Sequence, residues 1–216
     1  MARPSRQTDQ RLIQAALDLM PASGLGALKV RQVSAKAGVN LGMFHYHFKS
    51  KREFNRRVLQ ALYERFFERL TGAVEAAGGA APRERLRAAV LTIARFAREH
   101  RGLFLAVERD IVDGNREALA FVRENFTRHG MIMYRLIRDC QRAGTIRRLP
   151  FPTVVAMIAA PQAMPVLAVA VLERVTAGRF FGLPLGTIAR LLLTDRAMAL
   201  RLDLSLGALA PAGSRG

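Results

Sequence analysis

The stretch GVNLGMFHYHFKSK, Gly38 to Lys51, is dense in side chains that could bind or react. It holds two histidines, a tyrosine, two phenylalanines and two lysines within 14 residues. A metal site is the first possibility. On a helix, however, residues two apart point about 200° away from each other, so His45 and His47 cannot easily close on one ion. Since no neighbouring Cys, Asp or Glu stands at a typical ligand spacing, we expect no metal here and no cofactor.

A packed core and a recognition surface remain possible for this stretch. Phe44 and Phe48 lie four residues apart, so one helical face can turn both rings inward. The other side chains of the helix are then left outward: Leu41, Gly42, Met43, His45, Tyr46 and His47. Small, aromatic and imidazole groups beside Lys49 and Lys51 suit a DNA groove. A glycine lets the helix backbone approach the duplex closely, and a methionine can contact a thymine methyl. Phenol, imidazole and ammonium groups can donate hydrogen bonds to phosphate oxygens.

The elements that position this surface form a helix-turn-helix. Val30–Ala37 is predicted to be helical, Gly38 to close it in a left-handed conformation, and Asn40 to cap a third helix that runs to about Phe48. Before them, a first helix from Thr8 to Met20 ends at the Pro21 to Gly24 stretch. After them, Ser50 to Glu53 forms a capping box that opens a long helix reaching Gly78.

The rest of the chain is also helical in pattern. We find no run of alternating apolar and polar residues bounded by turn signals, and therefore expect no strand. The remaining helices are predicted at about 82–100, 102–113, 117–143, 151–177 and 187–204. The fold class is therefore all-α, with about nine helices.

Composition points to a polyanionic partner. The chain has 34 basic and 17 acidic residues, a formal charge of +17, and the first 60 residues alone carry 11 basic and 3 acidic side chains. Nucleic acid and an anionic membrane both fit such a charge, and a high-GC genome would by itself enrich arginine.

One cysteine, Cys140, allows no intrachain disulfide, and the polar N-terminus lacks a signal-peptide stretch, so we expect a cytoplasmic protein. No phosphate loop, nucleophile elbow or paired ligand motif indicates an enzyme.

One segment challenges this interpretation. Phe151 to Leu172 carries no charge over 22 residues, long enough to span a bilayer. Pro161 and Pro165 interrupt it, and Gln162 lies in its middle. We predict that it is buried in the core or under a second subunit. A basic helical protein at a membrane surface remains the alternative function.

Residues from about Thr8 to Phe54 resemble the DNA-binding domain of the TetR family of bacterial transcriptional regulators. The resemblance rests on LKVRQVSAKAGV (28–39), NLGMFHYHF (40–48) and KSK (49–51). It implies a DNA-binding domain at 1–52, an effector-binding and dimerisation domain at 53–216, and a repressor released from a palindromic operator by a small molecule. The implied DNA contacts are Lys29, Arg31, Asn40, Leu41, Gly42, Met43, His45, Tyr46, His47, Lys49 and Lys51.

The resemblance also implies roles for the later helices. The last two would pair with those of a second subunit, covering 151–177 and a stripe of Ile188, Leu191, Leu192, Met198 and Leu202. The middle helices would enclose an effector pocket. Its candidate lining is Phe96, His100, Phe104, Phe121, Phe126, Met131, Met133, Tyr134 and Met157. This chain departs from the family at Lys29, where a Thr or Ser cap is usual, and at His45, where Tyr is common, so the operator sequence does not carry over.

Overall fold

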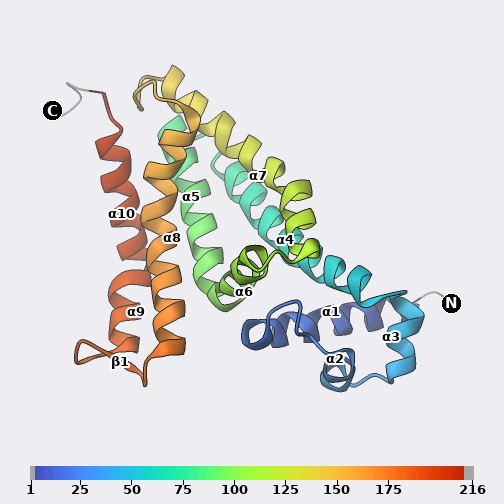
Figure 1. Cartoon of the computed structure of the whole chain (residues 1–216). Coiled ribbons are helices and arrows are strands. Elements are labelled where there is room, and N and C mark those ends of the chain that lie inside the picture. Colours follow the sequence, from blue (N-terminus) through green and yellow to red (C-terminus); the bar gives the residue numbers. More distant parts are fainter. Residues whose placement is uncertain (1–2, 212–216) are drawn as a thin grey trace. The chain divides into compact units, whose positions relative to one another are not determined.

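The computed structural model describes residues 3–211, with side chains from Gln7 onward, and this part of the chain is helical almost throughout (Figure 1). It contains ten helices and one pair of two-residue strands, which confirms the all-α class. The elements are α1 (Arg3–Ser23), α2 (Val30–Ala37), α3 (Leu41–His47), α4 (Lys51–Ala76), α5 (Pro82–Glu99), α6 (Arg101–Val112), α7 (Arg116–Arg142), α8 (Phe151–Val175), β1 (Arg179–Phe180), β2 (Leu183–Pro184), α9 (Leu185–Leu193) and α10 (Asp195–Ala208).

The chain divides into two compact units. The first comprises residues up to Arg65 together with Gly102–Phe126, and the second comprises Phe66–Arg101 and the residues from Thr127 onward. This division differs from the predicted boundary between residues 52 and 53. The start of α4 belongs to the first unit because its side chains bond there: Asn55 Nδ2 donates to the Leu25 carbonyl (3.4 Å).

In the first unit, α1, α2 and α3 pack around a common core. Leu12, Met20 and Val33 are fully buried in it. α1 continues to Ser23, three residues beyond the predicted end, because Pro21 interrupts the hydrogen-bond ladder without ending the helix. The end comes at Gly24, whose φ of 77° is in the left-handed region that glycine adopts without strain.

The predicted capping box at the start of α4 is present. Ser50 Oγ accepts the Glu53 N–H at 3.1 Å. The Glu53 carboxylate reaches back to the N–H of Lys49 (3.3 Å), one residue beyond the usual partner. The long helix therefore begins where the sequence indicates.

In the second unit, α8 packs against α5, α9 and α10. Val166, Val169 and Leu193 form a buried cluster at this contact, with Ile188 and Leu192 packed on it. Arginines of α5 and α6 add ion pairs to the helices beside them. The pairs are Arg87–Asp203, Arg98–Asp195 and Arg101–Glu173, each at 2.7 Å.

An arginine of α10 bonds the carbonyl that Pro165 leaves unpaired inside α8. Pro165 has no N–H, so the carbonyl of Pro161 has no partner within the helix. Arg201 Nε donates to that carbonyl at 3.0 Å, and Arg201 Nη1 donates to the Leu192 carbonyl at 2.6 Å. The helix consequently runs unbroken from Phe151 to Val175.

The C-terminal part corrects two predictions. The single helix expected at 187–204 is two helices, because the chain breaks at Thr194, whose side chain accepts the Ala197 N–H (3.3 Å) and caps α10. A short hairpin, absent from the prediction, pairs β1 with β2 through Phe180 and Leu183. Strands of two residues are too short to produce an alternating pattern in the sequence.

Candidate nucleic-acid interface

Three phenylalanine rings fix α3 in the first unit. Phe44, Phe48 and Phe54 are each 1% exposed. Their centroids lie 5.4 Å (Phe44–Phe48), 4.9 Å (Phe44–Phe54) and 4.8 Å (Phe48–Phe54) apart, in tilted and edge-to-face contacts. Such ring pairs are worth about 0.5–1.5 kcal/mol beyond the area that they bury. The two inward positions predicted for this stretch, Phe44 and Phe48, are therefore confirmed.

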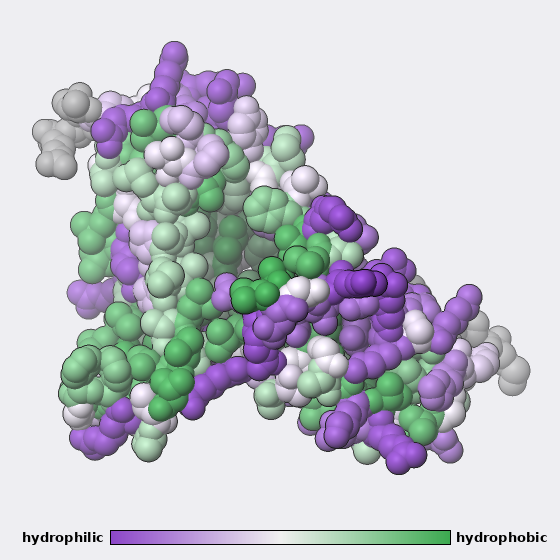
Figure 2. Space-filling view, in the orientation of Figure 1, coloured by the Kyte–Doolittle hydropathy of each residue, from purple (hydrophilic) through white to green (hydrophobic). Residues whose placement is uncertain are grey.

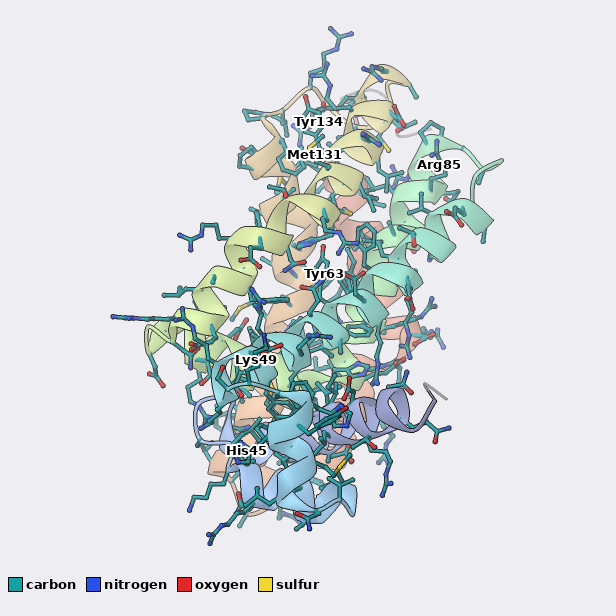
Figure 3. The ribbon with its side chains drawn as sticks, turned by 90° about the vertical axis from the view of Figure 1, so that its right-hand side faces the viewer. His45, Lys49, Tyr63, Arg85, Met131 and Tyr134 are labelled. Carbon is teal, nitrogen blue, oxygen red and sulfur yellow. The ribbon has the colours of Figure 1, made fainter. Side chains whose placement is uncertain are left out.

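The opposite side of α3 is open. Tyr46 is 78% exposed and Met43 38% exposed, and His45 and Gly42 are exposed as well. Figure 3 shows His45 near the outer end of this unit, with Lys49 a short way along the chain. The exposed face thus carries a thioether, a phenol and an imidazole without an ion pair in the described part of the chain.

Asn40 and Gly42 shape the start of this face. Asn40 Oδ1 accepts the Gly42 N–H at 2.8 Å, which confirms the predicted N-cap. A Cβ on Gly42 would meet only this Oδ1, at 3.4 Å, which is an ordinary contact. The fold therefore does not require a glycine at this position. The missing side chain instead leaves room for a molecule outside the chain to approach the backbone.

His47 does not belong to the exposed face, which corrects its predicted phosphate contact. Its side chain is 4% exposed, and Nδ1 forms a close contact with the Asp9 carboxylate on α1. The reason is helical geometry: in this register His47 turns toward α1, roughly 100° away from Tyr46. His47 and Asp9 therefore tie the end of α3 to α1 and act as positioning residues.

The cations near α3 fall into two groups. Lys29, Arg31 and Lys49 are exposed, and none forms an ion pair or side-chain hydrogen bond within residues 7–211. Lys51, by contrast, donates through Nζ to the Gly26 carbonyl at 2.7 Å. One of its three donors is thus used inside the protein, and its predicted phosphate contact has to compete with that bond.

The turn between α2 and α3 is held by an arginine that sequence reasoning missed. Arg11 of α1 donates to the carbonyls of Ala37 and of Gly38 (3.2 Å). Gly38 itself has a φ of 62°, the left-handed closure that the sequence predicts. Arg11 is separated from its two partners by 26 and 27 positions in the sequence, so no local pattern could have indicated these bonds.

The loop between α1 and α2 is anchored to α6. The Asp110 carboxylate, 6% exposed, accepts the backbone N–H of Leu25 at 2.8 Å. Farther along the same unit, Arg52 of α4 pairs with Glu117 of α7 at 3.0 Å. The loop before α2 is therefore bonded to the end of α6, and the start of α4 to the beginning of α7.

The candidate effector residues are divided between the units. Phe104, Phe121 and Phe126 belong to the first unit, whereas Phe96, His100, Met131, Met133, Tyr134 and Met157 belong to the second. Phe96 is 1% exposed, lies 5.4 Å from the Phe66 ring and stacks on His100 at 4.1 Å, which makes it a core residue. Burial lowers the pKa of His129, whose ring meets Phe66 edge-on.

The exposed candidates are Phe126, Met131, Tyr134 and Met157, at 36–63% exposure. Their exposure makes them available to a ligand. Within the described residues, no group of three or more His, Cys, Asp or Glu side chains could hold a metal ion.

Comparison with known proteins agrees with this geometry. Residues 12–58 match the family model described as "Bacterial regulatory proteins, tetR family". The chain is 22% identical over 160 residues to YttP of Bacillus subtilis, a probable HTH-type transcriptional regulator, covering 74% of this chain and 77% of that protein. It is 39% identical over 61 residues to the HTH-type regulator TtgW of Pseudomonas putida, covering 28% of this chain and 42% of that one.

Solved structures show the same fold over nearly the whole chain. A TetR-family transcription regulator from Marinobacter aquaeolei has a TM-score of 0.70 at 18% identity, covering 98% of this chain and 100% of its own. The transcriptional regulator FadR from Bacillus subtilis, in complex with stearoyl-CoA, has a TM-score of 0.65 at 17% identity, covering 86% and 98%. These relatives are transcriptional regulators and not enzymes, and the predicted resemblance is confirmed.

Proposed function

We infer that this chain, a TetR-family transcriptional regulator with a DNA-binding helix-turn-helix, acts in the cytoplasm as a homodimeric repressor that a small molecule releases from a palindromic operator. The observation that carries the DNA-binding surface is α3. Phe44, Phe48 and Phe54 lock it, and Gly42, Met43 and Tyr46 project from its other side. A short helix that is fixed by buried rings on one side and exposes a face beginning with glycine on the other suits the major groove.

The phosphate contacts come from the unengaged cations. Lys29 at the start of α2, Arg31 in its first turn and Lys49 after α3 are exposed around this face. Asn40, Leu41, Gly42, Met43, His45 and Tyr46 supply the surface between them. Cations of this kind position a protein on the duplex, whereas the residues on the helix read the base edges.

A selection on random duplexes tests this function. The full-length protein should enrich an inverted repeat with half-sites about 34–36 Å apart or a multiple of that spacing, because a two-fold dimer requires matched half-sites. The affinity for the enriched site should fall steeply with salt, since each phosphate contact releases counterions. Equal recovery of random duplexes, or an affinity independent of salt, would contradict the proposal.

The homodimer is supported by apolar surface that one chain leaves open. α8 is long and apolar enough to cross a membrane by length and composition, yet only 33% of its most apolar window is buried. Figure 2 shows hydrophobic residues gathered where α8 ends and the β1–β2 hairpin and α9 follow. Exposed apolar side chains of α8, the hairpin, α9 and α10 include Met164, Val171, Val175, Phe181, Leu183, Leu191, Leu200 and Leu204, at 42–89% exposure.

Burial within one chain removes most of the predicted stripe from the proposed interface. Met198 and Leu202 of the predicted stripe are completely buried inside one chain, and Ile188 and Leu192 pack on the Val166 cluster. Leu191 alone of that stripe is exposed, at 65%. The proposed interface therefore uses the outward side chains of α8 and α10, not the inward ones. A second copy would cover them better than lipid, because Arg174 lies on α8 and Asp203 on α10.

The effector is the remaining part of the proposal. The similar FadR structure holds stearoyl-CoA, and the half-exposed Met131, Tyr134 and Met157 of this chain offer apolar surface in the second unit. We propose a small molecule with an apolar part as the ligand. The test is release: addition of the effector should lower operator affinity without unfolding the protein, measured by fluorescence anisotropy of a labelled operator.

A further inference from the structure

A basic hollow lies at the end of α7, where the chain turns toward α8. It has a volume of about 380 Å³ and is lined by Arg138, Gln141, Arg142, Arg148 and Leu149. Three of these five side chains are guanidinium groups, and no carboxylate lines the hollow. Arginine presents its donors in a planar fork that matches the oxygens of a phosphate, so the lining favours a phosphate-bearing ligand.

The backbone around the hollow is held from two sides. Gln141 Nε2 donates to the carbonyls of Arg147 (3.2 Å) and Leu149 (2.8 Å), which fastens the loop after α7 to that helix. On the other side, the Arg147 N–H donates to the Leu209 carbonyl at 2.8 Å, and its guanidinium donates to the Ala208 carbonyl at 2.6 Å. The loop that carries Arg148 is therefore ordered before any ligand arrives, which reduces the entropic cost of binding.

The charge in the hollow is not neutralised by the chain. Asp139 pairs with Arg142 of the lining at 3.2 Å and with Arg85 of α5 at 3.9 Å. One carboxylate thus serves two guanidinium groups. Arg148 and Arg138 form no ion pair within residues 7–211, and Arg138 lies instead 6.0 Å from the centre of the Tyr134 ring. At least two positive charges remain for an anion.

An apolar path begins at the edge of the hollow. Leu149 belongs to its lining, Arg138 lies over Tyr134, and the Tyr134 ring meets Phe151 at 5.4 Å. Met131 lies one turn farther along α7, as Figure 3 shows, and is 49% exposed. The charged hollow and the exposed apolar side chains consequently follow one another along the same helix.

We propose that this hollow binds the phosphate group of an amphipathic effector, with the apolar part of the ligand lying along Leu149, Tyr134 and Met131. This assignment rests on the proposed function for its regulatory meaning, but the binding itself requires only the second unit. Arg138 and Arg148 are the principal anion contacts. Arg142, already paired with Asp139, contributes less.

Calorimetric titration of the full-length protein with octyl phosphate tests the site. Pyrophosphate serves as a probe of the charged group alone, and octyl glucoside as a probe of the chain with a neutral head. Arg148→Gln and Arg138→Gln should each weaken octyl phosphate binding about tenfold or more, the usual effect of losing a charge-assisted hydrogen bond. Arg135→Gln is the matched control, because Arg135 is an exposed arginine of α7 outside the lining.

The outcomes separate the site from its role. Equal losses in Arg135→Gln and Arg148→Gln, or octyl glucoside binding as tightly as octyl phosphate, would overturn the site. Octyl phosphate binding that leaves operator affinity unchanged would keep the site and overturn its role as an effector site. A lower operator affinity of Arg148→Gln in the absence of any ligand would instead indicate that the hollow contacts DNA phosphates, and would also overturn the proposal. Failure of the protein to select an operator would affect only the proposed function.

Discussion

The Asp110 carboxylate accepts the backbone N–H of Leu25 at 2.8 Å, although the two residues are 85 positions apart. Both are buried: Leu25 is fully inaccessible and Asp110 is 6% exposed. Asn55 donates to the carbonyl of the same Leu25 at 3.4 Å, so both backbone groups of this residue are bonded by side chains from α4 and α6. A movement of either helix would thus directly displace the loop that leads into α2.

Asp110→Ala should lower the free energy of unfolding by about 1–3 kcal/mol, because it leaves the Leu25 N–H buried without an acceptor. Urea denaturation monitored by circular dichroism measures this loss. Asp110→Asn keeps an acceptor oxygen and should cost less. If both variants unfold at the wild-type urea midpoint, the bond does not stabilise the loop. Asp113→Ala is a control, since Asp113 is exposed just after α6.

On the proposed DNA surface, Met43→Ala and Tyr46→Phe should change base preference, whereas Lys49→Ala should weaken binding to all sequences alike. A specific base contact is worth about 1–3 kcal/mol of discrimination, and loss of one phosphate contact should lower the salt slope by about one. Parallel duplex selections with each variant, followed by salt titrations, separate the two effects. A shifted preference in Lys49→Ala together with an unchanged one in Met43→Ala would reverse the proposed docking.

Much of the first unit could be predicted because its signals are local. The Asn40 cap bonds two residues ahead, Ser50 bonds three ahead, and Gly38 closes α2 by its own backbone conformation. The contacts of His47 and Lys51 could not be predicted, because their partners, Asp9 and Gly26, lie far away in the sequence. Charge and exposure on a helical wheel cannot show that a polar side chain has already found such a partner.

The second unit was harder to predict from the sequence for the same reason. The apolar pattern at 187–204 predicts one helix, and only the side chain of Thr194, which caps α10, reveals the break. The tolerance of α8 for Pro165 depends on Arg201, which bonds the Pro161 carbonyl although it lies 40 residues later in the sequence. Apolar periodicity also cannot distinguish a side chain buried within one chain, such as Met198, from one left for a second copy, such as Leu200.

Arg201→Met should destabilise the second unit by about 1–3 kcal/mol. The substitution preserves most of the side-chain volume but leaves the carbonyls of Pro161 and Leu192 without their donor. The loss is moderated because burial already opposes the charge on Arg201 and lowers its pKa. Thermal unfolding compared with Arg196→Met, an exposed arginine of the same helix, measures the effect. Equal melting temperatures of the two variants would contradict a role for Arg201 in supporting α8.

Stability should fall as the pH is lowered through the range in which His129 titrates. Burial lowers the pKa of His129 below its ordinary value of 6.5, so the unfolded chain binds a proton more readily than the folded one. The contribution of His129 is therefore complete above pH 6.5 and is lost as the pH falls through the pKa of the folded state. His129→Gln should reduce the loss of stability between pH 7.5 and 5.5. Identical pH profiles for wild type and His129→Gln, from urea midpoints, would disprove the linkage.

Leu200→Glu and Leu204→Glu should yield folded monomers. The two side chains of α10 are 59% and 66% exposed in one chain, so a carboxylate there is tolerated in the monomer and not in a dry contact between two copies. An obligate interface of this kind buries on the order of 2,000 Å² or more, and both variants should also lose tight operator binding. Sedimentation velocity at micromolar concentration without detergent, together with circular dichroism, measures assembly and folding. Leu202→Glu is the contrasting variant: Leu202 is 0% exposed, and its replacement should unfold the second unit. If the wild type sediments as a stable monomer, or if Leu204→Glu remains dimeric, the second copy does not cover α10. A wild type that is soluble only in detergent would favour the membrane alternative.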